Sequence, residues 1–352
     1  MTRSVASAAA SVLIVGPAWV GDMVMAQTLF KLLRQQNPAL AIDVLAPAWS
    51  LPLLARMPEV RRAIPMPLGH GALELRVRYR LGRKLRAEHY DQAILLPNSF
   101  KSALTPWFAH IPKRTCWRGE MRYGLLNDLR ILDKPKYPLM VQRFAALAVE
   151  PSAPLPAQLP KPQLTIDTAA RAQLCEQFHL ATDMPILALC PGAEFGPAKR
   201  WPETHYADVA RAMLERGWQV AIFGSEKDQP VAQAIIATLP EALRTRVANL
   251  AGATKLEQAV DLLSAATAVV TNDSGLMHIA AATGRPLVVV YGSTSPGFTP
   301  PLAEHVEILQ LKVDCGPCFQ RECPLGHLKC LRDLPPERVL AALDRLLTNN
   351  HR

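Results

Sequence analysis

The order of apolar runs along the chain is the strongest constraint on its fold. Short runs rich in β-branched residues alternate with longer helical patterns such as residues 22–36. The expected strands are 11–16, 41–46, 63–66, 92–97 and 114–117 in the first half, and 186–190, 219–223, 268–271 and 287–291 in the second. Strands that alternate with helices are typical of βαβ units, so the sequence predicts an α/β fold with parallel sheets.

A proline-rich stretch, residues 151–162, separates the two series of strands. Proline fixes φ, so this stretch predicts a semi-rigid connector. We expect one domain over 1–160 and a second over 161–334. An amphipathic pattern over 335–347 predicts a final helix, and one placement for this last segment, 335–352, is back against the N-terminal domain.

Composition narrows the class of protein. Hydrophobic residues make up 49% of the 352 and charged residues 20%, which excludes a disordered, collagen-like or coiled-coil chain. No apolar stretch reaches the ~20 residues that cross a bilayer, so any membrane contact is expected to be peripheral. The seven cysteines are an odd number and suit a reducing compartment. Residues 11–16 fit a strand better than a secretory signal, so we expect a cytoplasmic protein.

Positive charge is concentrated in the first half of the chain. Residues 1–150 hold 21 Lys and Arg against 10 Asp and Glu, a net charge of +11, whereas the remainder holds 18 against 20, a net charge of −2. The densest basic segment contains Arg76, Arg78, Arg80, Arg83, Lys84 and Arg86. Such a field attracts an anionic partner. Charge alone leaves nucleic acid, an acidic lipid surface, a phosphorylated small molecule and a merely solvated face all open.

Asp22 is the candidate catalytic group of the first half. It follows the first expected strand in the segment 16–22 and lies in the opening turn of the first helix. Ligands of open α/β sheets bind beyond the carboxyl ends of strands, so Asp22 is placed to act as a general base. The alternative interpretation is that Asp22 only complements the helix dipole.

The segment 269–278 is the strongest motif of the second half, because a strand runs into a Ser-Gly turn and then an alanine-rich helix. The free N–H groups of that helix start, beside Ser274 and Gly275, suit the diphosphate of a nucleotide. His278 lies one turn further on, where a buried or capping histidine is the alternative. Lys199 and Arg200 follow an earlier strand and offer cations to the same crevice, unless they are ordinary surface residues.

Four cysteines near the C-terminus, Cys315, Cys318, Cys323 and Cys330, have spacings found in zinc sites. A structural zinc ion is one interpretation, and a redox dithiol or an idle group of reduced thiols are the others. The sequence contains no Asp-x-Asp triplet and no phosphate-binding Walker motif, so a catalytic metal is not indicated.

Long irregular motifs give the chain a family resemblance. It resembles the ADP-heptose:lipopolysaccharide heptosyltransferases of Gram-negative bacteria, above all the heptosyltransferase II branch of glycosyltransferase family 9. The resemblance covers nearly the whole chain and is carried by residues 16–23, 46–49, 57–60, 65–74, 96–104, 117–127, 190–202 and 271–278. The segment 314–331 departs from that branch, because it is rich in cysteine.

The resemblance implies a GT-B architecture, in which two Rossmann-like doubly wound parallel-sheet domains face each other across a cleft. It implies metal-independent, inverting transfer of L-glycero-D-manno-heptose from ADP-heptose to the first heptose of the Kdo-lipid A inner core. Asp22 would be the general base, and Lys199, Ser274 and Gly275 would hold the diphosphate. Glu226 would accept a hydrogen bond from the ribose, while Asp273 and His278 would position the heptose.

The acceptor implied by the resemblance is anionic, which gives the basic first half a partner. We expect acceptor contacts from Arg61, Arg62, Lys101, Arg118 and Arg122, and peripheral contact with the cytoplasmic face of the inner membrane. A sister heptosyltransferase that adds the first or a later heptose is the nearest alternative function. A nucleotide-sugar binding module without catalysis and a nucleic-acid-binding protein are alternatives of other classes, and the second is disfavoured by the 6% aromatic content.

Overall fold

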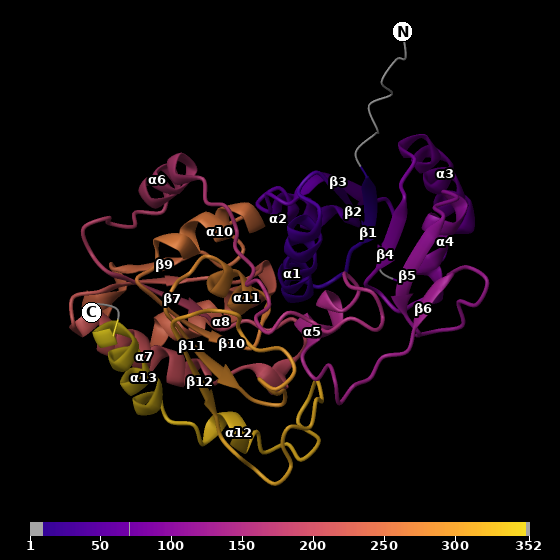
Figure 1. Cartoon of the computed structure of the whole chain (residues 1–352). Helices are drawn as coiled ribbons and strands as arrows, with labels where there is room; N and C mark the ends of the chain where they lie inside the picture. Colours follow the sequence, from indigo (N-terminus) through magenta and orange to yellow (C-terminus); the bar gives the residue numbers. More distant parts are fainter. Residues whose placement is uncertain (1–9, 70, 350–352) are drawn as a thin grey trace. The chain divides into compact units, whose positions relative to one another are not determined.

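The computed structural model describes residues 10–69 and 71–349 and divides the chain into two compact units, Met1–Pro160 and Lys161–Arg352 (Figure 1). The division falls within the proline-rich stretch. Each unit is built around one sheet of parallel strands. The expected α/β class with Rossmann-like doubly wound sheets is confirmed.

The sheet of the first unit has the order β3-β2-β1-β4-β5-β6. Its strands are β1 Ser11–Val15, β2 Ala41–Pro47, β3 Val60–Met66, β4 Gln92–Leu95, β5 Lys113–Trp117 and β6 Asp128–Arg130. Its helices are α1 Val20–Gln36, α2 Leu51–Leu54, α3 Leu75–Leu85, α4 Phe100–Phe108 and α5 Met140–Ala145. α1 packs with α5, and α3 packs with α4. Gly82 permits the second contact, because a Cβ there would lie 2.4 Å from that of Phe108.

The sheet of the second unit has the equivalent order β12-β11-β10-β7-β8-β9. Its strands are β7 Ile186–Cys190, β8 Gln219–Ile222, β9 Val247–Asn249, β10 Ala268–Asn272, β11 Leu287–Tyr291 and β12 Val306–Gln310. Its helices are α6 Thr168–Gln177, α7 Glu203–Glu215, α8 Gln229–Thr238, α9 Glu241–Arg244, α10 Leu256–Ala265, α11 Gly275–Ala282, α12 Lys329–Arg332 and α13 Pro336–Asn349. The contacts of α7 with α8 and α13, and of α10 with α6 and α11, form two helix groups.

Central strands were predictable because they are buried on both faces. β1, β7, β10 and β11 are buried at every position, which is why they read as continuous apolar runs. The sequence did not reveal β6, β9 and β12. All three lie at a sheet edge and are only partly buried, so their polar residues conceal the strand pattern.

The strand order reverses once in each sheet, between β1 and β4 and between β7 and β10. At such a point the loops after two neighbouring strands turn in opposite directions and leave a crevice at the carboxyl edge. In the first unit these are the loops after Val15 and Leu95. In the second they are the loops after Cys190 and Asn272, so the fold itself selects where ligands can bind.

The final helix, α13, packs on the second unit. Its apolar stripe, Val339, Ala342, Leu343 and Leu346, is buried in the core of that unit, and the helix contacts α7 and β12. Ion pairs from Arg216 to Asp344 and from Arg345 to Glu307 flank the stripe. The apolar face of α13 is therefore used within the second unit, and the suggested placement of 335–352 against the N-terminal domain stays a prediction.

Within the described residues, no helix combines the length and the apolar character needed to cross a membrane.

The packing of α13 predicts a stability effect. Leu343→Ala removes a fully buried side chain and is expected to lower the free energy of unfolding by about 2–5 kcal/mol. Denaturant unfolding measures this change. Leu75→Ala, at a position that is half exposed on α3, is the matched control and should cost well under ~1 kcal/mol. Equal effects of the two substitutions would contradict the burial of α13.

Candidate active site

The loop after β1 places Asp22 at the carboxyl edge of the first sheet. Asp22 lies in the first turn of α1 and is half-buried. Gly16 leaves room for close packing here, because a Cβ at that position would lie 2.8 Å from the end of the Met23 side chain and 3.3 Å from the Ala46 Cβ. The helix dipole favours negative charge at this position. Asp22 is thus a carboxylate held at the mouth of the crevice.

Lys101 and Arg118 lie at the same edge of the sheet. Lys101 is in the first turn of α4, which follows β4, and Arg118 directly follows β5. β1, β4 and β5 are neighbouring parallel strands, so their carboxyl ends point the same way. Arg118 is exposed and Lys101 half-buried. The fold brings both cations to the side of the sheet that carries Asp22.

Arg122 has a structural environment instead of the expected contact with the acceptor. Its side chain is 1% exposed and donates hydrogen bonds to the carbonyls of Pro97 and Trp117, at 2.9 and 2.7 Å, and to Ser102 Oγ at 3.2 Å. These bonds tie the loop after β4 to the end of β5. The sequence showed a cation in a loop, but it did not show that carbonyl groups surround the cation.

Arg61 and Arg62 lie at the other end of the sheet, near the start of β3. Both bind the buried carboxylate of Asp43, with Arg61 Nη2 at 2.7 Å and Arg62 Nη2 at 2.8 Å from Oδ2. Two successive side chains reach one partner because the pairing of β2 with β3 shifts by one residue at this point. The Tyr90 hydroxyl also donates a hydrogen bond to Oδ2, at 2.6 Å. The two arginine side chains, 49% and 44% exposed, are therefore anchored on a buried carboxylate at the end of the sheet opposite to Asp22.

The second crevice contains a buried ion pair. Lys199 ends the short turn Pro197–Lys199 in the loop after β7, and its Nζ lies 2.7 Å from Oδ2 of Asp273, which follows β10. Only 14% of the Lys199 side chain and 3% of the Asp273 side chain are exposed. Thr294, in the loop after β11, donates to the same carboxylate oxygen. Three loops of one sheet edge thus meet at Asp273.

Asn272 fixes the neighbouring loops relative to one another through hydrogen bonds. Its amide donates to the Pro191 carbonyl at 2.6 Å, and its Oδ1 accepts hydrogen bonds from the Trp201 backbone and the Tyr206 hydroxyl, both at 3.1 Å. All four residues are buried. Asn272 was not among the predicted site residues. The sequence did contain a signal for this site residue, namely an Asn next to an Asp at the end of a fully buried strand.

His278 is buried on α11 beside this ion pair. Burial lowers the pKa of the imidazole to about 4, against the opposing effect of the Asp273 carboxylate, and the Lys199 ammonium lowers it further. The imidazole is therefore neutral at physiological pH. Neutral imidazole offers one hydrogen-bond donor and one acceptor, which suits hydroxyl groups of a sugar better than a phosphate.

Three buried polar atoms at this edge, Ser274 Oγ, Arg200 Nε and Ser293 Oγ, have no hydrogen-bond partner among the described residues. Ser274 lies at the N-cap position of α11, yet its Oγ makes no capping bond and is enclosed without an acceptor or donor. Arg200 Nε is enclosed in the same way, while its Nη2 reaches the Ala193 carbonyl at 3.4 Å and Asp228 at 3.8 Å. Buried polar groups are nearly always satisfied, so these atoms offer hydrogen-bonding capacity to water or to a polar ligand.

Glu226 occupies the exposed start of a turn, Glu226–Asp228, that follows β8. The neighbouring Asp228 is buried and accepts hydrogen bonds from the Ser225 backbone and hydroxyl. Gly192 and Gly224 pack on Asp228 so closely that a Cβ at either would clash with it, at 2.5 and 2.7 Å. Glu226 is accessible beside the crevice, and Asp228 fixes its loop.

Comparisons with known proteins agree with this geometry. The sequence profile of glycosyltransferase family 9 (heptosyltransferase) matches residues 78–329. Lipopolysaccharide heptosyltransferase 2 of Salmonella typhimurium is 52% identical over 342 residues, which cover 96% of this chain and 98% of that protein. Lipooligosaccharide heptosyltransferase 2 of Haemophilus influenzae is 53% identical over 350 residues, covering 96% and 99%.

The chain belongs to glycosyltransferase family 9, the heptosyltransferases. A solved structure agrees: that of Escherichia coli ADP-heptose lipopolysaccharide heptosyltransferase II is 49% identical, with a TM-score of 0.88, covering 97% of this chain and all of the other. The expected family and GT-B fold class are therefore confirmed, and this family 9 protein is a glycosyltransferase.

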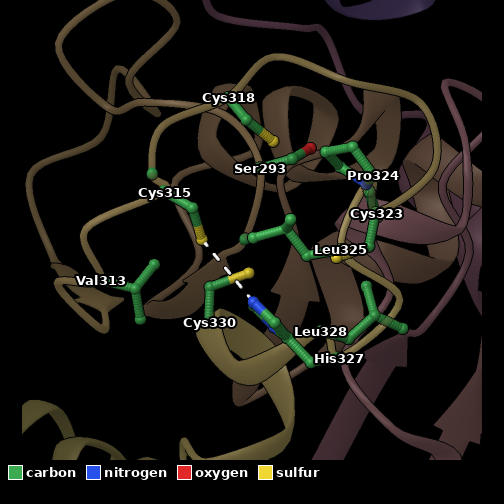
Figure 2. A pocket seen from close by; sticks show the side chains of 13 residues that line it. Ser293, Val313, Cys315, Cys318, Cys323, Pro324, Leu325, His327, Leu328 and Cys330 are labelled. Carbon is green, nitrogen blue, oxygen red and sulfur yellow. Dashed lines mark hydrogen bonds between the residues drawn. The ribbon is translucent and has the colours of Figure 1, made fainter.

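The four C-terminal cysteines of this family 9 enzyme line one small pocket (Figure 2). Burial raises the pKa of the Cys330 thiol, and the charges of the other three thiols raise it further. Backbone N–H groups, that of Leu328 foremost, lower the pKa of Cys323. Among the described residues, no three His, Cys, Asp or Glu side chains are already gathered as metal ligands, so the expected zinc site is not confirmed.

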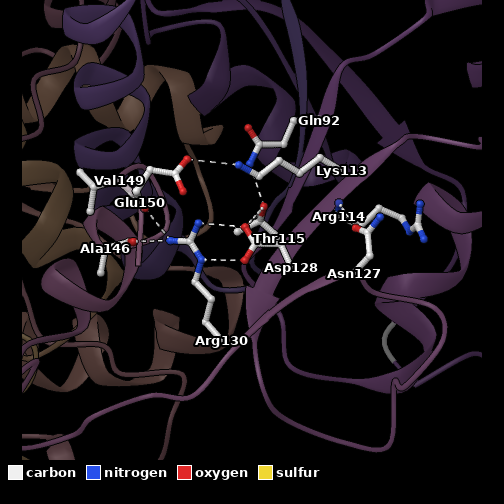
Figure 3. Close-up of polar contacts among 10 residues, drawn as sticks. All are labelled: Gln92, Lys113, Arg114, Thr115, Asn127, Asp128, Arg130, Ala146, Val149 and Glu150. Atoms are coloured by element: carbon white, nitrogen blue, oxygen red, sulfur yellow. Dashed lines mark hydrogen bonds and ion pairs between the residues drawn. The ribbon is translucent and has the colours of Figure 1, made fainter. Parts of the chain in front are cut away.

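A second cavity, of about 430 Å³, lies beside β6 in the first unit. Arg130 lines it, and Figure 3 shows this side chain between Asp128 and the carbonyls of Ala146 and Val149. Thr115 also donates to Asp128, at 2.8 Å. This network joins β5, β6 and the segment after α5, so these groups maintain the fold of the heptosyltransferase.

The Asp43 network predicts how the stability of this heptosyltransferase depends on pH. Burial disfavours the carboxylate, but hydrogen bonds from Arg61 and Tyr90 and the charges of both arginines outweigh it, so the pKa of Asp43 lies below 3.8. Its contribution is full above about pH 4 and is lost as the pH falls through the folded-state pKa. Asp43→Asn should cost about 3 kcal/mol at pH 7 and progressively less in acid.

Denaturant unfolding at a series of pH values measures this difference. Asp208→Asn is the matched control, because Asp208 forms an exposed pair with Arg211 that is worth at most ~0.5 kcal/mol. A penalty for Asp43→Asn that stays constant down to pH 2 would show that the Asp43 charge does not stabilise the fold.

Proposed function

We propose that this enzyme transfers a heptose from ADP-heptose to the first heptose of the Kdo-lipid A inner core, with inversion at the anomeric carbon. The buried Lys199–Asp273 pair beside the unpartnered Ser274 hydroxyl is the observation that carries the proposal. The relatives of about 50% identity are named heptosyltransferase 2 and match this chain over nearly its whole length, which supports the second heptose as the one transferred.

The second unit binds the donor in this proposal. The diphosphate lies at the N-terminus of α11, where the backbone N–H groups and the Ser274 hydroxyl donate to it and Gly275 leaves room for close approach. Lys199 and Arg200 supply positive charge. Glu226 accepts a hydrogen bond from the ribose, and Asp273 with the neutral His278 orients the heptose hydroxyls.

The first unit binds the acceptor. Asp22 takes the proton of the acceptor hydroxyl, and Lys101 and Arg118 attract the carboxylates and phosphates of the inner core. We leave Arg122 out of this site, because backbone carbonyls surround its buried guanidinium. Arg61 and Arg62 are about half exposed although they pair with Asp43, so their contact with the acceptor stays a prediction.

The reaction follows from where charge develops. As Asp22 removes the proton, the acceptor oxygen forms a bond to the anomeric carbon on the face opposite to ADP. The bond from that carbon to the phosphate oxygen breaks, and its electron pair leaves with ADP. Lys199, Arg200 and the N–H groups of α11 stabilise the new negative charge, an effect worth ~3 kcal/mol for one well-placed donor. In this scheme the positive charge at the diphosphate comes from the protein's own residues.

Peripheral contact with the cytoplasmic face of the inner membrane belongs to the same proposal. The outer side of α3 is strongly basic, with Arg76, Arg80, Arg83 and Lys84 exposed. Leu75 and Tyr79 are also exposed there, at 50% and 42%. A helix face with both cations and apolar groups suits an anionic lipid surface better than nucleic acid.

The base assignment predicts the effect of a single substitution. Asp22→Asn should leave the affinity for ADP unchanged and lower kcat by about 10²–10⁴, because the amide cannot accept the proton. Release of ADP on mixing donor and acceptor measures turnover, and calorimetry measures ADP binding. Asp183→Asn, at an exposed position of the second unit, is the matched control. Near-normal turnover of the Asp22 variant would rule out its role as base.

The choice of acceptor separates the candidate functions. We expect transfer to Kdo-lipid A that carries one heptose, and much slower transfer to acceptors that carry none or two. Mass spectrometry of the products after incubation with ADP-heptose measures this preference. A preference for the unsubstituted or the doubly substituted acceptor would identify a sister heptosyltransferase, and absence of any product would indicate a binding module.

A further inference from the structure

The cysteine-rich segment 313–330 gathers four thiols around a cavity of about 20 Å³, which is room for one water-sized occupant. Cys315 and Cys318 come from one turn of the segment, Cys323 from a second and Cys330 from the start of α12. Figure 2 shows all four side chains around the same pocket. Four cysteine sulfurs are a known donor set of structural zinc sites.

The turn after Cys323 brings its side chain to the same pocket as the other three thiols. The Gly326 N–H donates to the Cys323 carbonyl at 3.1 Å. Gly326 adopts φ +68°, which an L side chain rarely tolerates. This tight turn lets Cys323, Leu325 and Leu328 line one cavity together with Cys315, Cys318 and Cys330.

His327 assists the thiol group as a hydrogen-bond donor. Its Nδ1 accepts the Lys329 backbone N–H at 3.0 Å, so the proton of the neutral ring lies on Nε2. Nε2 lies 4.0 Å from Cys315 Sγ. The ring therefore presents a donor to that sulfur, and the four cysteines remain as the metal ligands.

We propose that Cys315, Cys318, Cys323 and Cys330 bind one zinc ion as thiolates, and that this ion fixes the loop that carries Lys199. The four sulfurs have to draw together to reach the ~2.3 Å of a Zn–S bond. Three of the four lie on loops, where small side-chain and backbone shifts suffice. Each thiol releases a proton as it binds the metal.

The second half of this proposal concerns the loop that carries Lys199, and it rests on the role in binding ADP-heptose proposed for Lys199 above. Hydrogen bonds connect this loop to the cysteine-rich segment. The Ala198 N–H donates to the Arg321 carbonyl at 3.0 Å, and Gly196 packs on that carbonyl so closely that a Cβ would lie 2.4 Å away. The Phe319 N–H donates to the Ser293 carbonyl at 2.7 Å, and the Ser293 N–H donates to the Ala198 carbonyl at 3.1 Å.

These bonds bracket the turn Pro197–Lys199 from both sides. Arg321 and Phe319 lie between Cys318 and Cys323 in the chain, so fixing those two sulfurs fixes the carbonyl and N–H groups that position the turn. Lys199 and Arg321 also both lie over the Phe195 ring, at 4.9 and 5.3 Å from its centre. An ordered segment 315–330 therefore holds Lys199 where it meets Asp273.

Metal analysis of the full-length chain tests the site directly. Protein purified without a metal-binding tag under reducing, anaerobic conditions should contain about one zinc per chain by mass spectrometry. Cys318→Ser and Cys330→Ser should lose most of this zinc, whereas Cys175→Ser, at a buried cysteine of α6, should retain it. Loading metal-free protein with Co²⁺ should produce the intense absorption of thiolate-bound cobalt. A chain that contains no zinc, and takes none up from a zinc buffer, overturns the site.

Calorimetry with ADP tests the link to the donor loop. Zinc-free protein should bind ADP about tenfold more weakly than zinc-loaded protein, since one charged contact to the diphosphate is misplaced. Gly196→Ala should have the same effect with its zinc retained, because it displaces the Arg321 carbonyl without touching a thiol. The Gly196→Ala variant therefore tests the connection between the cysteine-rich segment and ADP binding even if the zinc-free chain does not fold.

The Lys199→Ala variant distinguishes the effect of the zinc site on ADP binding from the direct role of Lys199 in that binding. It should weaken ADP binding and leave zinc content unchanged. Unchanged ADP affinity in Lys199→Ala would refute the donor assignment alone. Equal ADP affinity of zinc-loaded wild type and Gly196→Ala would refute the link and leave the donor assignment standing.

Discussion

Burial of the central parallel strands determines where chemistry can occur in both units. β1, β7 and β10 are covered on both faces, so polar side chains along them would have to be paired inside the core. Only the loops beyond the strand ends are free to carry charge towards a ligand. Because the strand order reverses beside β1 and beside β10, two such loops diverge at each point and leave a crevice.

The same constraint explains which residues could be found from sequence. Asp22, Lys199, Asp273 and Ser274 all follow apolar runs that are unmistakable strands, so their position at a sheet edge was predictable from the chain alone. Asn272 was within reach of the same reasoning, since it is the last residue of β10. The family resemblance then supplied chemical roles that strand patterns cannot give.

The positive charges of the first half did not reveal which partners the fold gives each arginine. Arg61 and Arg62 pair with one buried carboxylate, and carbonyl groups surround Arg122. The register shift that turns both Arg61 and Arg62 towards Asp43 leaves no trace in composition. The strands β6, β9 and β12 were missed for a related reason, since edge strands need no continuous apolar run.

The buried Lys199–Asp273 pair contributes little to stability and is better explained by function. Replacing a buried ion pair with apolar residues is often neutral or even stabilising, so stability alone does not explain its retention. Asp273 balances the ammonium charge while the crevice holds no anion and directs it towards the N-terminus of α11. Under the proposed function, a bound diphosphate gives Lys199 a second negative partner while the pair with Asp273 remains. The proposal therefore implies that folding already meets the cost of burying the ammonium charge, before the donor binds.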